Sequence, residues 1–317
     1  MDPRNILLIG GSGFIGSHVA EKLTERGLSL RVPTRRRERA KHLLLLPSIE
    51  LVEANVHDQR ELAALCEGMD TVINLVGILQ SRSGEPYGAD FRVAHVDLPT
   101  KILAACRAAG IGRLVHLSAL HAAADAPSEY LRSKAAGEEA VLGTGGEIAV
   151  TVFRPSVVFG PEDKFLNLFA RLQRTLPVVF LACPEARFQP VFAGDVARAI
   201  VESLSQRASF GNRYDLVGPR AYTLRELVGF AGAAAGHRRP IVGLSAGLGK
   251  LQAMAMEFLP GKLLSRDNVR SMQIDSTSSA PFPFGIIRGA LEAIAPEYLS
   301  GISPRRQYMA LRGRAGR

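Results

Sequence analysis

The sequence predicts an α/β protein: a Rossmann-type doubly wound parallel sheet with a smaller C-terminal, mostly helical substrate lobe. Over the first 160 residues, short β-rich apolar runs alternate with segments of helical apolar spacing, the pattern of a parallel sheet covered by helices. Gly27, Gly68 and Gly110 stand where the predicted helices end, and glycine readily adopts the left-handed conformation found there. Beyond Pro161 the spacing loosens and prolines interrupt it, which predicts a second, less regular part.

The elements follow in order from this alternation. Strands are predicted at residues 4–9, 28–34, 49–53, 70–76, 113–117 and 148–153. Helices are predicted at residues 14–26, 61–67, 93–109 and 130–141. We divide the chain into an NAD(P)-binding domain (1–160), a substrate or partner lobe interleaved with the sheet (161–300) and a basic tail (301–317).

Composition excludes several classes of protein. The 317 residues are 47% hydrophobic and 22% charged, which argues against disorder and against a disulfide-built miniprotein. The longest uncharged stretch, residues 276–287, is too short for a spanning helix. Cys66, Cys106 and Cys183 form no CxxC pair, so we expect small buried apolar groups in a reducing compartment. The first strand begins almost at the N-terminus, and we therefore expect no leader and a cytoplasmic protein.

The net charge of +9 is concentrated in two segments. Residues 31–41 and residues 305–317 each carry a net charge of +5, so the remainder is close to neutral. Because no basic stripe interleaved with aromatic residues runs along the chain, we expect no nucleic-acid binding.

A glycine loop directly follows the first predicted strand. Gly10, Gly13 and Gly16 have the spacing GxxGxxG, and Phe14 and Ile15 begin the helix after it. Small residues allow a tight turn, close approach of backbone N–H groups to a pyrophosphate and close packing of helix on strand. The loop therefore predicts a dinucleotide site formed by these five residues.

The end of the second strand bears on the choice of cofactor. An acidic side chain there binds a ribose hydroxyl, whereas arginine accommodates a 2′-phosphate. No acidic residue lies between Arg26 and Glu38, and Arg35 and Arg36 stand at this position. NADPH or NADP is thus favoured over NAD. Further along the chain, Val56 follows the third strand, and Val76 and Gly77 follow the fourth, where a doubly wound fold lines the nucleotide crevice.

Three residues form a candidate catalytic set. Ser118 ends the fifth strand, and Tyr130 and Lys134 are four residues apart on one face of the next helix. The lysine ammonium is expected to lower the pKa of the phenol, which then exchanges a proton with a carbonyl or alcohol while Ser118 holds the substrate oxygen. Tyr130 and Lys134 also serve as predicted cofactor contacts.

Together with the segments Arg154–Pro161 and Gly194–Ala197, these motifs resemble the short-chain dehydrogenase/reductase superfamily in its extended form. Residues 130–138 and 159–167 resemble its atypical group, which contains the NADPH-binding accessory subunit of respiratory complex I. This resemblance implies a tightly held NADPH, a cofactor contact at Pro155 and a peripheral position on a membrane enzyme. It also implies a link to ubiquinone synthesis or its assembly, and the expected lack of a leader suggests a bacterial form.

Other candidate sites are weaker. The seven histidines show no metal-ligand spacing, so we expect no metal. Asp195 is interpreted as the N-terminal cap of a helix at residues 195–203, and His116 as a core residue. Residues 244–259 have helical apolar spacing, which fits either core packing or an amphipathic helix at a lipophilic pocket or membrane surface. The basic tail is either solvated or attracted to anionic lipid.

Two functions remain open. One is an NADP(H)-dependent reductase acting on a lipophilic carbonyl or quinone-related substrate. The other is a non-catalytic NADPH-binding accessory or assembly factor for respiratory complex I or ubiquinone biosynthesis, in which the nucleotide stabilises the fold. In either case we expect a cytoplasmic protein, with peripheral association at the inner face of the cytoplasmic membrane.

Overall fold

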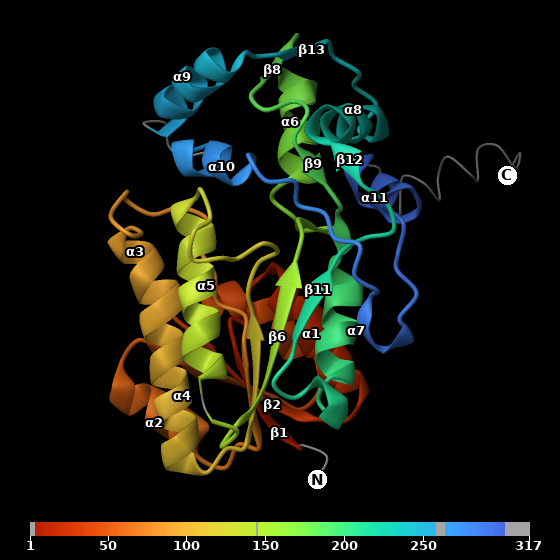
Figure 1. Ribbon diagram of the computed structural model, residues 1–317. Coiled ribbons are helices and arrows are strands. Elements are labelled where there is room, and N and C mark those ends of the chain that lie inside the picture. The colour runs from red at the N-terminus through yellow and green to blue at the C-terminus, as the bar shows by residue number, and fades with distance from the viewer. Residues whose placement is uncertain (1–3, 144, 258–263, 302–317) are drawn as a thin grey trace, which may run out of the picture.

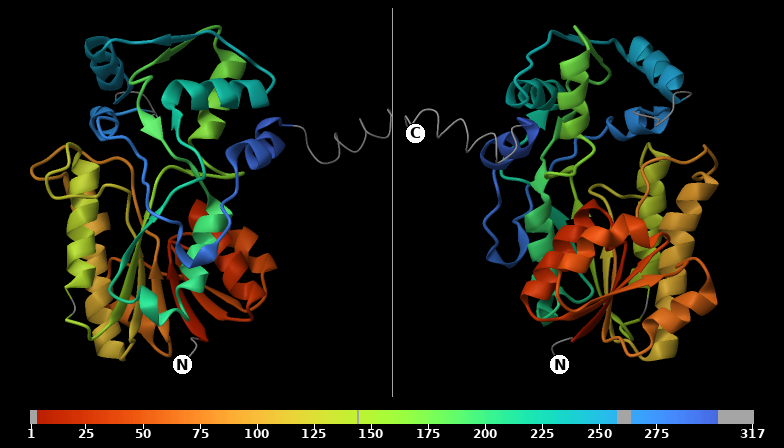
Figure 2. Two further views of the ribbon diagram at one scale, coloured as in Figure 1. Left: turned by 45° about the vertical axis from the view of Figure 1, so that its right-hand side comes forward. Right: turned by 180° about the vertical axis from the view of Figure 1, so that it is seen from behind.

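A computed structural model describes residues 4–143, 145–257 and 264–301. It shows a sheet layer with helices on both faces and a smaller lobe beyond one end of the strands (Figure 1). Strand β1 (Asn5–Ile9) begins at the opposite end of the sheet layer from the lobe, as both further views also show (Figure 2). The predicted fold class is confirmed.

Within the described residues, seven parallel strands form the central sheet. In their order across the sheet the strands are β11 (Arg213–Leu216), β6 (Ala149–Pro155), β5 (Arg113–Leu117), β4 (Thr71–Asn74), β1 (Asn5–Ile9), β2 (Ser29–Thr34) and β3 (Ile49–Glu53). The first six strands along the chain lie where the sequence predicted them, with ends that agree to within two residues. The strand order reverses between β1 and β4, which creates the crevice where doubly wound folds bind ligands.

Helices cover both faces of the sheet. One face carries α1 (Phe14–Glu25), the 3₁₀ helix η1 (Arg37–Leu45) and α7 (Ala193–Glu202). The other carries α2 (Gln59–Cys66), α4 (Leu98–Ala109) and α5 (Glu129–Leu142). The helix predicted at 93–109 starts earlier, because α3 (Ala89–Arg92) runs into a π-helical turn, η2 (Val93–Asp97), before α4. Gly27, Gly68 and Gly110 all have positive φ, as their positions predicted.

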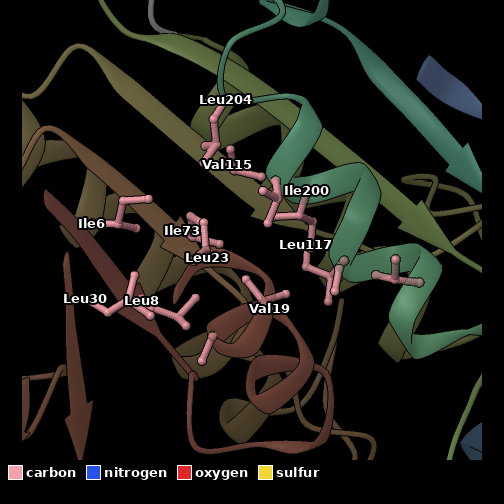
Figure 3. Close-up of a cluster of buried hydrophobic side chains, with 14 of the residues drawn as sticks. Ile6, Leu8, Val19, Leu23, Leu30, Ile73, Val115, Leu117, Ile200 and Leu204 are labelled. Carbon is pink, nitrogen blue, oxygen red and sulfur yellow. The ribbon is translucent and has the colours of Figure 1, made fainter. Parts of the chain in front are cut away.

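A cluster of aliphatic side chains joins the sheet to α1 and α7 (Figure 3). Leu8, Ile73 and Val115 from neighbouring strands are fully buried against Val19 of α1 and Ile200 of α7. Each such side chain contributes roughly 1.5–3 kcal/mol by leaving water. Residues from beyond position 160 therefore complete the core of the sheet layer.

The lobe contains short strands and five helices among the described residues. Its parallel pairs are β7 (Val158–Phe159) with β10 (Val191–Phe192) and β8 (Val179–Leu181) with β13 (Ile241–Gly243); the antiparallel pair is β9 (Arg187–Phe188) with β12 (Tyr222–Thr223). Its helices are α6 (Leu166–Thr175), α8 (Leu224–Ala234), α9 (Ala246–Glu257), α10 (Arg266–Ser271) and α11 (Leu291–Leu299). Its main core lies between α6, α8 and α11. No helix in the described part of the chain is long and apolar enough to cross a membrane.

Several smaller expectations can be compared with the structure. Cys66 and Cys106 are buried and unpaired, while Cys183 is only half-buried. His116 is a core residue of β5, as expected. The capping role of Asp195 is wrong, because α7 begins at Ala193 and its N-cap makes no side-chain hydrogen bond. Asp195 instead accepts the backbone N–H of Gly289 at 2.6 Å, which ties α7 to the chain just before α11.

Candidate functional site

The glycine loop turns tightly between β1 and α1. Gly10 has φ +84°, and its carbonyl accepts the backbone N–H of Gly13 at 3.0 Å. A Cβ on Gly16 would lie 2.2 Å from the carbonyl oxygen of Gly10, so a side chain at Gly16 would force helix and loop apart. Gly13 is the N-cap and provides no capping side chain, which leaves N–H groups of the first helical turn available to an anion.

The predicted 2′-phosphate site lies at the end of β2 and is open to solvent. The side chains of Arg35 and Arg36 are both exposed. Thr34 is buried, and its hydroxyl donates to the carbonyl oxygen of Arg36 at 3.1 Å, which fixes the turn that presents the two arginines. Burial lowers the pKa of His57, and the positive charges of Lys101 and Arg35 lower it further. The ends of β2 and β3 therefore meet in one basic corner.

The remaining predicted cofactor residues lie around the ends of the strands. Val56 and Val76 are half-buried at the edge of the core beneath α2 and α4, and Ile15 lies at the edge of the opposite core. The ring of Phe14 would lie 3.1 Å from a Cβ on Gly160, so α1 begins close under the segment after β7. Pro155 ends β6, and its carbonyl accepts the N–H of Leu120 at 3.0 Å.

Lys134 points from α5 to the end of β5. Its ammonium is buried and donates to the carbonyl oxygen of Leu117 at 2.7 Å. A Cβ on Gly77 would lie 3.7 Å from Lys134 Nζ, so the loop after β4 passes close to the ammonium. Burial lowers the pKa of Lys134 to about 8, and the nearby Glu138 carboxylate opposes this shift. At neutral pH, Lys134 is therefore a charged donor that is easily neutralised.

Ser118 offers a buried hydroxyl at the end of β5. The Ser118 N–H donates to the carbonyl oxygen of Phe153 at 2.7 Å, which fixes the backbone. Its Oγ has no hydrogen-bond partner among the described residues, although it is buried. A buried hydroxyl without a partner costs stability, so this atom fits a site that hydrogen-bonds to a ligand oxygen.

Tyr130 lies in the first turn of α5 and packs in an aromatic group. Its ring centroid is 5.6 Å from that of His95 and 6.0 Å from that of Phe91. The expected lowering of the phenol pKa is wrong, because burial raises the pKa of Tyr130 to about 12. Spacing of four residues placed Tyr130 and Lys134 on one helix face but did not account for the cost of removing a phenolate from water. Tyr130 is thus a neutral proton donor over the whole physiological range.

His95 is a residue that the sequence reasoning considered only as a metal ligand. It lies in the π-helical turn and is buried. The hydroxyl of Ser133 donates to the Tyr130 carbonyl at 2.7 Å, so it must accept from His95 Nδ1 at 2.8 Å. His95 Nε2 in turn accepts the N–H of Ile78 at 3.0 Å. A neutral His95 therefore connects the loop after β4 to the turn that carries Tyr130, and burial lowers its pKa to about 2.

The lobe also holds the start of α5. Asp267 of α10 accepts the backbone N–H groups of Glu129 at 2.7 Å and Tyr130 at 3.0 Å. The buried Glu129 carboxylate accepts the N–H groups of Gly84 and Gly88, and Arg270 lies 3.5 Å away. Figure 1 shows α10 above the lobe-facing end of α5. No spacing rule could have found Asp267, because it lies 137 residues from Tyr130 along the chain.

A protein-family model matches the part of the chain that forms this crevice. The model describes the NAD dependent epimerase/dehydratase family and covers residues 6–216, two thirds of the sequence. The chain belongs to this family. It is an extended short-chain dehydrogenase/reductase, as the glycine loop and the residues Ser118, Tyr130 and Lys134 suggested. Family membership supports dinucleotide binding at the crevice without distinguishing NADP from NAD.

Characterised relatives include subunits of respiratory complex I. The chain is 33% identical over 227 residues to the mitochondrial NADH dehydrogenase (ubiquinone) 1 alpha subcomplex subunit 9 of Mus musculus, a match that covers 70% of this chain and 58% of that protein. It is 34% identical to the Arabidopsis thaliana subunit, covering 69% and 55%. The match therefore spans little more than half the length of these relatives. A ceramide reductase of Caulobacter vibrioides is 30% identical, with coverage of 63% and 61%.

Solved structures agree on the fold. MoeE5 in complex with UDP-glucose and NAD superposes with a TM-score of 0.65 at 23% identity, covering 77% of this chain and 86% of that one. The UDP-glucose 4-epimerase of Thermus thermophilus, in complex with NAD, gives a TM-score of 0.61 at 22% identity, covering 85% and 99%. At this level of identity the likeness shows the architecture and leaves the substrate open.

Proposed function

We propose that the protein is an NADP(H)-dependent reductase that acts on a lipophilic carbonyl or a quinone-related substrate. The observation that carries the proposal is the buried, unpartnered Ser118 hydroxyl beside the carbonyl that holds the Lys134 ammonium. Such a pair can hold a substrate oxygen and a cofactor hydroxyl next to each other. The ceramide reductase among the relatives supports a lipophilic substrate, and a second relative is named NAD(P)H azoreductase.

The residues have distinct parts in this reaction. The reduced nicotinamide, when bound, supplies a hydride to the carbonyl carbon. Ser118 orients the carbonyl oxygen, and the neutral Tyr130 phenol gives that oxygen the proton that completes the alcohol. Lys134 stabilises the tyrosinate left behind until solvent restores its proton. The first turn of α1 binds the pyrophosphate, and Arg35 and Arg36 bind the 2′-phosphate.

A non-catalytic role is the second candidate, supported by the complex I subunits among the relatives. In that role, NADPH would stabilise the native fold while the protein serves as an accessory or assembly factor for respiratory complex I or ubiquinone biosynthesis. Under both proposals the protein works in the cytoplasm, peripherally at the inner face of the cytoplasmic membrane.

The Tyr130→Phe variant separates the two roles. If the protein is a reductase, this variant retains NADPH affinity and loses turnover by on the order of 10² to 10⁴-fold, because only proton transfer is removed. Oxidation of bound NADPH by quinones and long-chain ketones measures turnover, and fluorescence titration measures affinity. Tyr214→Phe is the matched control, since its hydroxyl donates to the carbonyl of Ala208 at 3.3 Å and has no other hydrogen bond within the described ranges. Unchanged turnover in Tyr130→Phe contradicts the acid role, and wild-type protein that never oxidises NADPH supports the accessory role.

A further inference from the structure

The outer edge of the lobe carries a group of exposed apolar side chains that the nucleotide site does not use. We call this group the apical face. Exposed fractions range from 42% to 56% for its members, Phe180, Val242, Leu248, Leu251 and Met254. Phe180 and Val242 are direct neighbours in the parallel pair of β8 and β13. The other three lie on α9, which is joined to β8 by a 2.9 Å hydrogen bond from Gln252 to the carbonyl of Phe180.

Helix α9 is turned with its larger apolar side chains outward. Its buried residues are Gly249 and Ala253, and Ala253 packs against Ala182 and Val269. At 100° per residue, Leu251 lies opposite the direction of Gly249 and Ala253, while Leu248 and Met254 lie about 120° to either side of that direction. A surface helix of a globular protein normally has the reverse arrangement. Core packing therefore accounts for the small residues of α9 and not for its leucines.

The charges around the apical face are mainly positive. Lys250 is exposed on α9, and Arg238 is exposed three residues before β13. Glu257 is the one acidic residue between positions 236 and 257, and its carboxylate is 3.0 Å from Arg266. Glu185, after β8, lies 3.6 Å from Arg225. In the described part of this edge, the acidic groups are thus paired while Arg238 and Lys250 remain available.

The apical face lies at the end of the molecule farthest from the start of the chain (Figures 1 and 2). We propose that it docks on the surface of an anionic lipid bilayer. The leucines, Met254 and Phe180 would enter the boundary between headgroups and acyl chains, while Arg238 and Lys250 contact lipid phosphates. Outward-facing leucines with flanking cations are typical of a helix that lies at a membrane interface. The positive charge favours a membrane that contains anionic lipid.

Helix α10 connects the apical face to the start of α5. Helix α10 packs beside α9 through Val269 and Ala253, and its Asp267 holds the backbone at Tyr130. The docking inference concerns binding alone and does not depend on which reaction the site performs.

Vesicle flotation of the full chain tests the inference without any substrate. Wild-type protein is expected to float with vesicles of phosphatidylglycerol and phosphatidylcholine, and much less with phosphatidylcholine alone. The triple variant Leu248→Gln, Leu251→Gln, Met254→Gln should bind the anionic vesicles more weakly by on the order of tenfold or more, because three apolar groups no longer leave water. Glutamine keeps helix propensity high, so the fold of α9 should persist.

The matched control is the double variant Leu45→Gln, Ile287→Gln. These side chains are exposed by 88% and 87% and lie away from the lobe edge, so this variant should float like wild type. Equal flotation of wild type and the α9 variant would overturn the proposal and assign any binding to another surface, such as residues 302–317. A wild type that does not float would also overturn it. So would a wild-type dimer that the α9 variant converts to a monomer, because a second copy would then cover the face.

Discussion

The two ends of the nucleotide crevice are built differently. At the basic corner, Arg35 and Arg36 are exposed and come from adjacent positions after one strand. At the nicotinamide end, Ser118 and Lys134 are buried, and His95 and Asp267 hold the surrounding backbone from distant parts of the chain. The proposed phosphate contacts therefore belong to a short solvated segment, whereas the proposed catalytic groups depend on packing across the whole fold.

The two ends of the crevice also differ in their electrostatics. The ammonium of Lys134 is removed from water, which lowers its pKa to about 8. Exposed arginines keep their water until a ligand displaces it, and salt screens their attraction for phosphate. Substitutions at the buried end should consequently change turnover and stability together, while those at the basic corner should change only nucleotide affinity.

The largest effect is expected for Lys134→Met. Turnover should fall on the order of 10² to 10³-fold, because the tyrosinate formed at Tyr130 loses its stabilising charge. Nucleotide-free protein should at the same time become more stable at pH 7 by roughly 1–3 kcal/mol, since a buried cation is replaced by an apolar chain of similar length. Steady-state kinetics and urea unfolding measure the two quantities.

The pH dependence of the unfolding free energy provides a control for the Lys134→Met variant, because its direction is known in advance. Its pKa in the folded protein is about 8, below the ordinary 10.5, so between these values the unfolded chain holds a proton that the folded protein has released. This group therefore adds stability as pH rises from about 8 to 10.5, and Lys134→Met should lack that increase. A variant whose unfolding free energy rises with pH like wild type would contradict the burial of the ammonium.

His95→Leu should have the next largest effect. It leaves the Ile78 N–H and the Ser133 hydroxyl without their partner, which is expected to cost roughly 2–4 kcal/mol of unfolding free energy. Because the folded pKa of about 2 lies below the ordinary 6.5, the wild-type contribution is complete above pH 6.5 and is lost as pH falls below it. The variant should lose less stability than wild type between pH 6.5 and 4.

The exposed His42 provides the comparison for this variant. His42→Leu should change the unfolding free energy little, since the exposed ring makes a single hydrogen bond among the described residues, with the Ser17 hydroxyl at 2.9 Å. If His95→Leu unfolds at the same urea concentration as wild type, His95 does not connect the loop after β4 to α5. If stability is lost without any change in the acid slope, the neutral state of His95 is wrong.

The smallest effect is expected at the basic corner. Arg35→Ala and Arg36→Ala should each weaken NADPH binding by about 1.5–3 kcal/mol and leave NADH binding nearly unchanged, because only NADPH carries the 2′-phosphate. Titration with both nucleotides at low and high salt measures this, and unfolding should be unaffected. Arg37→Ala is the matched control, as its exposed side chain was not assigned to the phosphate. Equal wild-type affinity for NADH and NADPH would refute the assignment.

The sequence predicted the features that depend on local patterns of residues. Apolar runs located the six strands, and the glycine spacing located a loop whose packing excludes a side chain at Gly16. It did not reveal the π-helical turn, because helical spacing through residues 93–109 looks the same with or without it. A Cβ on Gly137 would lie 2.1 Å from the carbonyl oxygen of His95, which shows how closely α5 and this turn pack. The spacing of residues along the sequence gives no sign of such a contact.

Electrostatic expectations failed where burial decided the outcome. The spacing of Tyr130 and Lys134 predicted a lowered phenol pKa, whereas burial raises it. Asp195 was assigned to the helix on which it stands, although its partner Gly289 is 94 residues away. In both cases the missing information was the set of neighbours in space. The basic tail at residues 305–317 lies outside the described residues, and its attraction to lipid stays a prediction.

The course of the chain between the sheet layer and the lobe limits how the two can move. After β6 it enters the lobe, returns to build α7 and β11, and leaves again for β12 and α8. It comes back once more at η4 (Pro283–Gly285), where Phe284 contacts Phe153 and Tyr214, before α11 rejoins the lobe. Because the chain crosses between the two parts several times, the lobe cannot rotate about a single hinge. Relative motion of the lobe and the sheet layer is therefore expected as small sliding displacements shared among these crossings rather than as rotation about one hinge.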